Sequence, residues 1–144
     1  KVSNFVTDFP TKELIERSVT EKDVILLPHL GASTKEAEIN CAVMASEQVK
    51  KFLNDGVIIN SINFPKVSLG RTTKYRMVII HKDEPGVIGM LAGEVATEGI
   101  NIPDMINKSR NEIAITLIDL EKEPSKKIIS NIKNMETVLS IRVC

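Results

Sequence analysis

The sequence predicts two structural parts, an α/β segment consisting of a strand and a long helix, followed by an α+β module with an antiparallel sheet. Three observations support this prediction. An apolar run at 24–27 precedes a helical pattern that continues to about residue 55. Apolar residues alternate with other residues at period two in three later stretches, which is typical of strands. Two helical apolar stripes, at 88–96 and 128–135, lie between those stretches.

The first 28 residues contain two strand-like pieces, at 2–6 and 23–27, separated by the polar run 12–22. A short, wholly apolar run is typical of a parallel strand buried on both faces, and Pro28 favours a strand over a helix just before it. A buried parallel strand needs neighbours. We therefore interpret this region as the end of a sheet that begins upstream, in a chain whose first residue is Lys1 rather than Met.

The long helix has recognisable start and stop signals. Ser33 with Glu36 matches a capping box, and Asp55 followed by Gly56 is a typical stop. The residues that recur on one face of this helix are Ala37, Cys41, Met44, Ala45, Gln48, Val49 and Phe52. Several of them are small, which favours close packing against a partner surface.

A polar stretch at 66–74 predicts a linker, and possible hinge, between residues 1–65 and a module at 75–144. The module has the order strand, helix, strand, strand, helix, strand, with strands near 75–80, 102–109, 113–118 and 139–143 and a hairpin turn at 109–111. Its second helix should begin at Pro124 and Ser125. The apolar stripe of that helix is Ile128, Ile129, Ile132 and Met135. Both helices should cover one face of the sheet.

The stretch from 81 to 101 organises the module. Pro is tolerated in a first helical turn, so a helix should begin near Pro85, and Gly99 should end it with a positive φ angle. The apolar stripe of this helix is Ile88, Leu91, Ala92, Val95 and Ala96.

The start of this helix has the chemistry of an amino-acid site. Backbone N–H groups near Pro85, Gly86 and Val87 lack partners within the helix and lie at the positive end of its dipole, where a carboxylate binds well. Asp83 could hold an ammonium group, and the Asn101 amide could reach the same cleft. The alternative is that Asp83 merely caps the helix and Asn101 fills a turn.

Composition excludes several classes of function. The 144 residues contain 19 basic and 19 acidic side chains, which gives no reason to expect nucleic acid or an anionic membrane as a partner. Aromatic residues are 3% of the chain and Trp is absent, so there is no platform for stacking bases. Two cysteines, Cys41 and Cys144, make no disulfide framework, and no apolar run approaches the ~20 residues of a membrane span. We expect a cytoplasmic protein.

The motif Asp83-x-Pro-Gly, with Asn101 at the next predicted strand, resembles the ACT domain, a ferredoxin-like βαββαβ module that binds amino acids in metabolic enzymes. His81 is similar to the histidine of the serine-sensing version. The resemblance implies that two modules join edge to edge into an eight-stranded sheet, with L-serine or another small amino acid in the interface. His81 and Asp83 would act from one chain and Asn101 from its neighbour. The implied effector-binding residues are His81, Asp83, Pro85, Gly86, Val87, Ile88, Asn101 and Ile102.

A second resemblance covers the first part of the chain. The motif Asp23-x5-His29-Leu-Gly-Ala-Ser-Thr-x-Glu-Ala, followed by Asn60-Ser-x-Asn-Phe-Pro, is similar to the C-terminal end of the D-2-hydroxyacid dehydrogenases, in particular the phosphoglycerate dehydrogenase branch. In that family the histidine at the position of His29 exchanges the substrate hydroxyl proton while hydride passes to or from NAD. Imidazole suits this role because its ordinary pKa, ~6.5, allows proton exchange near neutrality. The alternative is a solvated or core histidine.

The seven glycines include no Gly-x-Gly-x-x-Gly, so the turn that binds the pyrophosphate of NAD is missing. The two resemblances imply the regulatory end of an NAD-dependent oxidoreductase of L-serine biosynthesis, which converts 3-phosphoglycerate to 3-phosphohydroxypyruvate. The chain alone should be inactive and should bind no metal. Two alternatives remain: a module that only assembles a homo-oligomer through its unpaired sheet edges, and a segment that is itself an enzyme.

Overall fold

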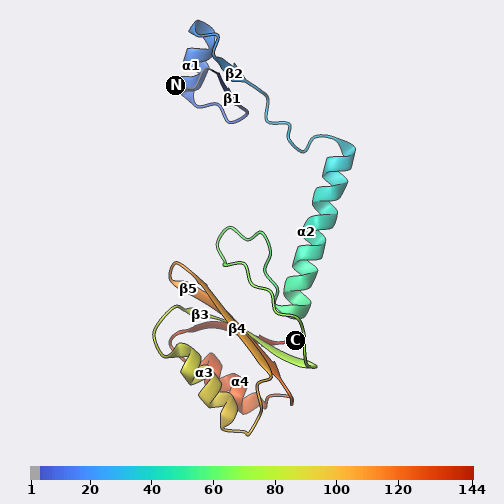
Figure 1. Ribbon diagram of the computed structural model, residues 1–144, viewed down its shortest axis with the longest axis vertical. Helices are drawn as coiled ribbons and strands as arrows, with labels where there is room; N and C mark the ends of the chain where they lie inside the picture. Colours follow the sequence, from blue (N-terminus) through green and yellow to red (C-terminus); the bar gives the residue numbers. More distant parts are fainter. Residues whose placement is uncertain (1–3) are drawn as a thin grey trace. The chain divides into compact units, whose positions relative to one another are not determined.

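The computed structural model describes residues 4–144, and the contacts divide the chain into two compact units between Val43 and Met44. The first unit contains β1 (Phe5–Thr7), α1 (Lys12–Thr20) and β2 (Val24–Leu26), with β1 parallel to β2 (Figure 1). Both strands agree with the sequence-based prediction within the described residues, and positions 2 and 3 of the first one lie outside them.

Helix α1 was not predicted, because 12–22 was described from the sequence only as a polar run. Thr11 caps this helix, because its Oγ1 accepts a hydrogen bond from the Leu14 N–H at 3.3 Å. Near the other end of the helix, Arg17 pairs with Glu21 one turn later, at 2.6 Å. The helix completes a strand–helix–strand unit, and its apolar residues Ile15 and Val19 lie four residues apart, which is helical spacing.

Helix α2 spans Lys35–Asp55 and ends as predicted, with Gly56 at φ +70°. The N-cap of this helix is Thr34 and not the predicted Ser33. The Ala37 N–H donates to the Thr34 hydroxyl at 3.2 Å. None of its residues is buried. Only the last turn, through Phe52, packs against the sheet of the second unit.

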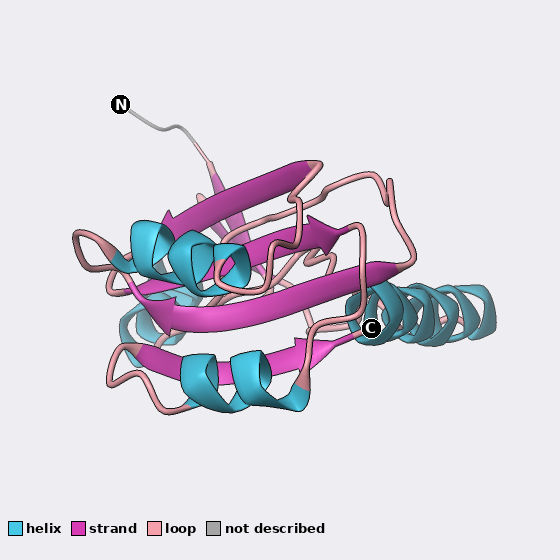
Figure 2. Cartoon of the chain, turned by 90° about the horizontal axis from the view of Figure 1, so that it is seen from below, coloured by secondary structure: helices cyan, strands magenta, loops and turns pink. Residues whose placement is uncertain are grey.

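The predicted βαββαβ module is confirmed in the second unit. Its sheet contains β3 (Tyr75–Lys82), β4 (Asp104–Arg110), β5 (Ile113–Leu120) and β6 (Val138–Val143), in the antiparallel order β4-β5-β3-β6. Figure 2 shows α3 (Val87–Ala96) and α4 (Lys126–Lys133) on one face of this sheet. The Ser125 hydroxyl caps α4 as expected. The buried cluster on that face is Met77, Ile79, Val87, Leu91, Val95, Ile100, Ile118, Leu120, Ile128 and Ile132.

The opposite face of the sheet is also covered, by the end of α2 and the chain that follows it. Val67 and Ile58 pair through two backbone hydrogen bonds, and both pack on Val78, Ile115 and Leu117. The stretch 66–74, predicted as a linker, is therefore partly built into this packed layer, since Val67 is 1% exposed. The division of the chain into two domains, at 1–65 and 75–144, stays a prediction.

An ion pair buried on this second face joins several segments. Arg76 and Asp119 lie directly opposite each other on β3 and β5, and both side chains are fully buried. Arg76 Nε and Nη2 donate to the two Asp119 oxygens at 2.5 and 2.9 Å. The remaining three N–H groups of the guanidinium donate to the carbonyls of Asp55, Leu69 and Gly70. All five donors of Arg76 are thus satisfied.

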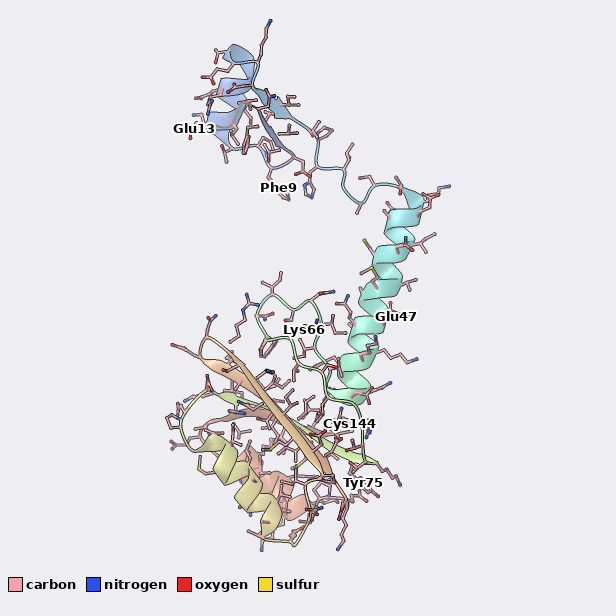
Figure 3. The ribbon with its side chains drawn as sticks, viewed as in Figure 1. Phe9, Glu13, Glu47, Lys66, Tyr75 and Cys144 are labelled. Carbon is pink, nitrogen blue, oxygen red and sulfur yellow. The ribbon has the colours of Figure 1, made fainter. Side chains whose placement is uncertain are left out.

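Asp119 is equally well satisfied, because the Thr72 N–H and hydroxyl both donate to its Oδ2, at 2.9 and 2.8 Å. Burial raises the pKa of the Asp119 carboxyl, but the hydrogen bonds from Arg76 and Thr72 lower it more, so that its net pKa lies below the usual value. A second arginine, Arg71, donates to the carbonyls of Lys74 and Cys144. Tyr75 and Cys144 are close together at this end of the sheet (Figure 3).

We predict that Asp119→Ala lowers the free energy of unfolding of the second unit by about 3–5 kcal/mol, because it leaves the Arg76 charge buried without its partner. Denaturant titration of the whole chain measures this change. Lys108→Ala, at an exposed position of β4, is the control and should change the free energy by less than about 0.5 kcal/mol. Equal effects of the two substitutions would contradict the role of the ion pair.

The same pair predicts a dependence of stability on pH. Because the folded pKa of Asp119 is lowered, its charge adds stability that is complete above the unfolded pKa of about 3.9 and is lost as the pH falls through the folded value. The difference in unfolding free energy between the native chain and Asp119→Asn should therefore shrink below about pH 4. A difference that grows on acidification would refute this assignment.

Candidate functional site

Six of the eight predicted effector residues lie at the junction between β3 and α3, namely His81, Asp83, Pro85, Gly86, Val87 and Ile88. The helix begins at Val87, two residues later than predicted, with Pro85 before it and Gly86 at the N-cap with φ +86°. Its buried stripe consists of Val87, Leu91 and Val95, while Ile88 is 38% exposed. The helix ends at Ala96, and Gly99, with φ +62°, follows slightly later than expected.

No side chain among the described residues caps α3. The alternative that Asp83 caps this helix is therefore wrong. The Gly86 carbonyl already accepts the first intrahelical hydrogen bond, from Met90, at 3.0 Å. The Val87 N–H donates to the Glu84 carbonyl at 3.5 Å. Because the glycine N-cap has no side-chain acceptor, the next donors of the helix, the Ile88 and Gly89 N–H groups, are left for solvent or an anion. This arrangement agrees with the chemistry expected for a carboxylate site.

Asp83 is exposed and lines an open depression next to that helix start. Its backbone N–H donates to the Glu112 carbonyl at 2.9 Å, which ties the loop to the β4–β5 hairpin. The depression has a volume of about 590 Å³. Its lining residues are Lys82, Asp83, Glu84, Asn111, Glu112, Ile113 and Leu139. An ammonium group in this space would meet more negative than positive charge.

His81 lies inside the module rather than on its surface. Only 1% of the residue is exposed to solvent. Its Nδ1 is 2.7 Å from the Lys82 carbonyl oxygen, and its Nε2 is 2.8 Å from Thr116 Oγ1. The β3–β6 ladder shifts register between Ile80 and His81, a bulge that redirects the following side chains. In one chain, therefore, both ring nitrogens already have partners.

Asn101 and Ile102 lie at the other end of the sheet and precede β4 rather than belonging to it. Asn101 Nδ2 donates to Glu121 Oε1 at 3.0 Å, just beyond the end of β5 that pairs with Tyr75. His81 is six residues along β3 from Tyr75, which corresponds to roughly 20 Å. One chain therefore does not bring Asn101 to Asp83, and the expected contribution from a neighbouring chain stays a prediction.

The predicted catalytic residue His29 lies in the first unit, with its side chain 63% exposed. Its Nδ1 is 3.3 Å from Asp8 Oδ2, and its ring meets the edge of Phe9 at a centroid distance of 4.4 Å. Sequence reasoning missed Asp8. The signal was available, because Asp8 directly follows β1 and His29 follows β2, and the carboxyl ends of parallel strands lie at one edge.

None of the helices in the part of the chain that the structure describes is both long and apolar enough to cross a bilayer. The same residues contain no cluster of three or more His, Cys, Asp or Glu side chains suited to a metal ion.

Sequence comparison gives the decisive observation. Two proteins named D-3-phosphoglycerate dehydrogenase are similar to the chain. The one from Escherichia coli is 32% identical over 70% of the chain. The one from Dictyostelium discoideum is 30% identical over 84% of the chain. The chain is a homologue of part of D-3-phosphoglycerate dehydrogenase. It spans 25% and 30% of the length of these two relatives. No family model matches the chain.

Solved structures similar to the chain include two ACT domains. One is the ACT domain from the GTP pyrophosphokinase of Chlorobium tepidum, with a TM-score of 0.43 and 11% sequence identity. The superposition covers 49% of the present chain and 95% of that domain's chain. The other, an ACT domain protein from Streptococcus pneumoniae, has a TM-score of 0.41 at 16% identity, with coverages of 49% and 85%.

We predict that Gly86→Ala costs about 1–2 kcal/mol of stability, because an alanine must adopt the left-handed conformation at φ +86° although its Cβ would meet open space. Gly56→Ala should cost more. At φ +70°, its Cβ would also lie 2.5 Å from Val78 Cγ2 and 2.8 Å from Leu117 Cδ2. Denaturant titration of both variants checks this order, and a milder effect at Gly56 would contradict it.

Proposed function

We propose that the chain is the regulatory end of a D-3-phosphoglycerate dehydrogenase whose ACT-type module binds L-serine as a feedback effector. The homology and the βαββαβ topology support a regulatory module of that enzyme. The observation that favours effector binding is the uncapped start of α3 beside the exposed carboxylate of Asp83. An anion site next to a cation site suits the carboxylate and ammonium groups of a free amino acid.

The complete site would need two copies of the chain. Edge strands β4 and β6 each pair with only one neighbour in the described chain, so either edge could add a second sheet. A two-fold axis could bring Asn101 of the partner subunit to the Asp83 end of the first module. A ligand in such an interface favours one arrangement of the two modules, and this preference is what feedback regulation requires.

The parent protein, in this proposal, is a cytoplasmic NAD-dependent oxidoreductase that acts on 3-phosphoglycerate, with His29 as the acid/base. Asp8 supports this role, because a carboxylate oxygen 3.3 Å from Nδ1 orients the imidazole ring. The residues of this chain do not fit NAD itself, since its glycines lack the spacing of the phosphate-binding turn. Hydride transfer would need residues outside this chain.

Isothermal titration calorimetry of the whole chain with L-serine tests effector binding. We expect heat with saturation at or below millimolar L-serine, because the site offers positions for both its ammonium and its carboxylate group. Analytical ultracentrifugation with and without L-serine measures assembly in the same samples. Absence of heat up to millimolar ligand, in a sample shown to be folded and dimeric, would remove the sensing function and leave assembly as the alternative.

Asn101→Ala separates sensing from assembly. If Asn101 contacts the effector, this variant should keep its oligomeric state and lose at least tenfold in L-serine affinity, the usual loss for a hydrogen bond to a charged group. Glu121→Ala is the matched control, because it removes the partner that Asn101 has within its own chain and leaves the amide in place. Unchanged affinity in Asn101→Ala would contradict the shared site.

A further inference from the structure

A chain of polar side chains crosses the helix-covered face of the sheet, where the neighbouring side chains are apolar. Thr116 lies directly opposite both Asn107 on β4 and Ile79 on β3, and it is fully buried. Its hydroxyl is 2.8 Å from Asn107 Oδ1 and 2.8 Å from His81 Nε2. Buried polar groups in such surroundings are costly unless they are paired, so this series of contacts restricts the conformations of all three side chains.

The contacts also fix the orientation of the His81 ring. The Lys82 carbonyl can only accept a hydrogen bond, so Nδ1, 2.7 Å away, carries a proton and donates it. Nε2 faces Thr116, whose hydroxyl can donate or accept, and the Asn107 amide can present its oxygen or its NH₂ group to complete either direction. The ring is thereby held at both nitrogens from inside the module.

The last contact in the series reaches the backbone just before the proposed effector loop. The Lys82 carbonyl belongs to the peptide bond that leads into Asp83, and the N–H of that same peptide bond donates to the Glu112 carbonyl. On the β6 side, the Lys82 N–H donates to the Thr137 carbonyl at 2.8 Å. The position of Asp83 thus depends on three fixed points, one of which is His81.

We propose that Asn107, Thr116 and His81 form a positioning relay that holds the Lys82–Asp83 strand end, and with it the effector loop, relative to edge strand β4. In this arrangement His81 acts on the effector loop through its hydrogen bond to the Lys82 carbonyl. The inference rests on the proposed effector function for its consequence in binding. The relay itself is a property of the folded chain and is tested separately.

Thr116→Val tests the relay because it removes the hydroxyl and keeps the shape of the side chain. The affinity of the whole chain for L-serine, measured by calorimetry, should fall on the order of tenfold. Thr116→Ser, which restores the hydroxyl, should return the affinity to within about threefold of the native value. Thr97→Val is the matched control at an exposed threonine and should leave the affinity unchanged.

NMR of the imidazole rings provides a readout that does not require ligand. The chain has two histidines, so two ring systems are observed, and His29 in the other unit is an internal control. In Thr116→Val the ring ¹⁵N signals of His81 should shift and those of His29 should not. Amide hydrogen exchange at Asp83 should accelerate at least threefold. Asn107→Leu, at the half-buried far end of the relay, should cause the same changes in smaller measure.

The outcomes separate the relay from the proposed function. If native protein binds no L-serine but the His81 signals and Asp83 exchange respond as expected, the relay stands and the effector assignment fails. If native protein binds L-serine and Thr116→Val binds it equally well, with unchanged His81 signals and Asp83 exchange, the relay is overturned and the effector assignment stands. Loss of affinity that Thr116→Ser does not restore would also overturn the relay.

Discussion

The buried ion pair between Arg76 and Asp119 is the constraint on which the second unit depends. A charge inside a protein is tolerated only when all its hydrogen-bonding groups are satisfied, and here the five donors of one guanidinium meet a carboxylate and three carbonyls. Those carbonyls belong to the end of α2 and to the stretch after Val67. The pair therefore fixes this covering layer to β3 and β5 and leaves the opposite face of the sheet for α3 and α4.

This division of the sheet determines where ligand chemistry is possible. One face is closed by α2 and the chain that follows it, and the other is closed by two helices, so the openings are at the ends of strands. At one such end, β3 passes through a bulge, Gly86 takes a left-handed conformation, and α3 begins without a side-chain cap. A helix start that is stabilised by no side chain retains its capacity to bind an anion.

The sequence predicted the module well where periodicity is strong. Alternation at period two identified the strands, and Ser125 and Gly56 marked a helix start and a helix end at the correct positions. It failed where local signals conflict. Charged residues dominate α1, which was described only as a polar run. Ser33 and Thr34 compete as caps, and the polar composition of 66–74 concealed Val67, which is almost fully buried. The roles of Asp83, the α3 start and His29 as site residues stay predictions.

The amino-acid sequence by itself determined the order of strands and helices in the second unit and the chemical type of the residues in the loop between β3 and α3, because periodicity, turn residues and motifs are local properties of a chain. Only the tertiary structure decided which of these residues are accessible. Burial of His81, its contacts with Thr116 and Asn107, the pairing of Asp8 with His29, and the placement of Asn101 at the far end of the sheet depend on segments distant in sequence. Such contacts are set by strand pairing and packing, which no local pattern encodes.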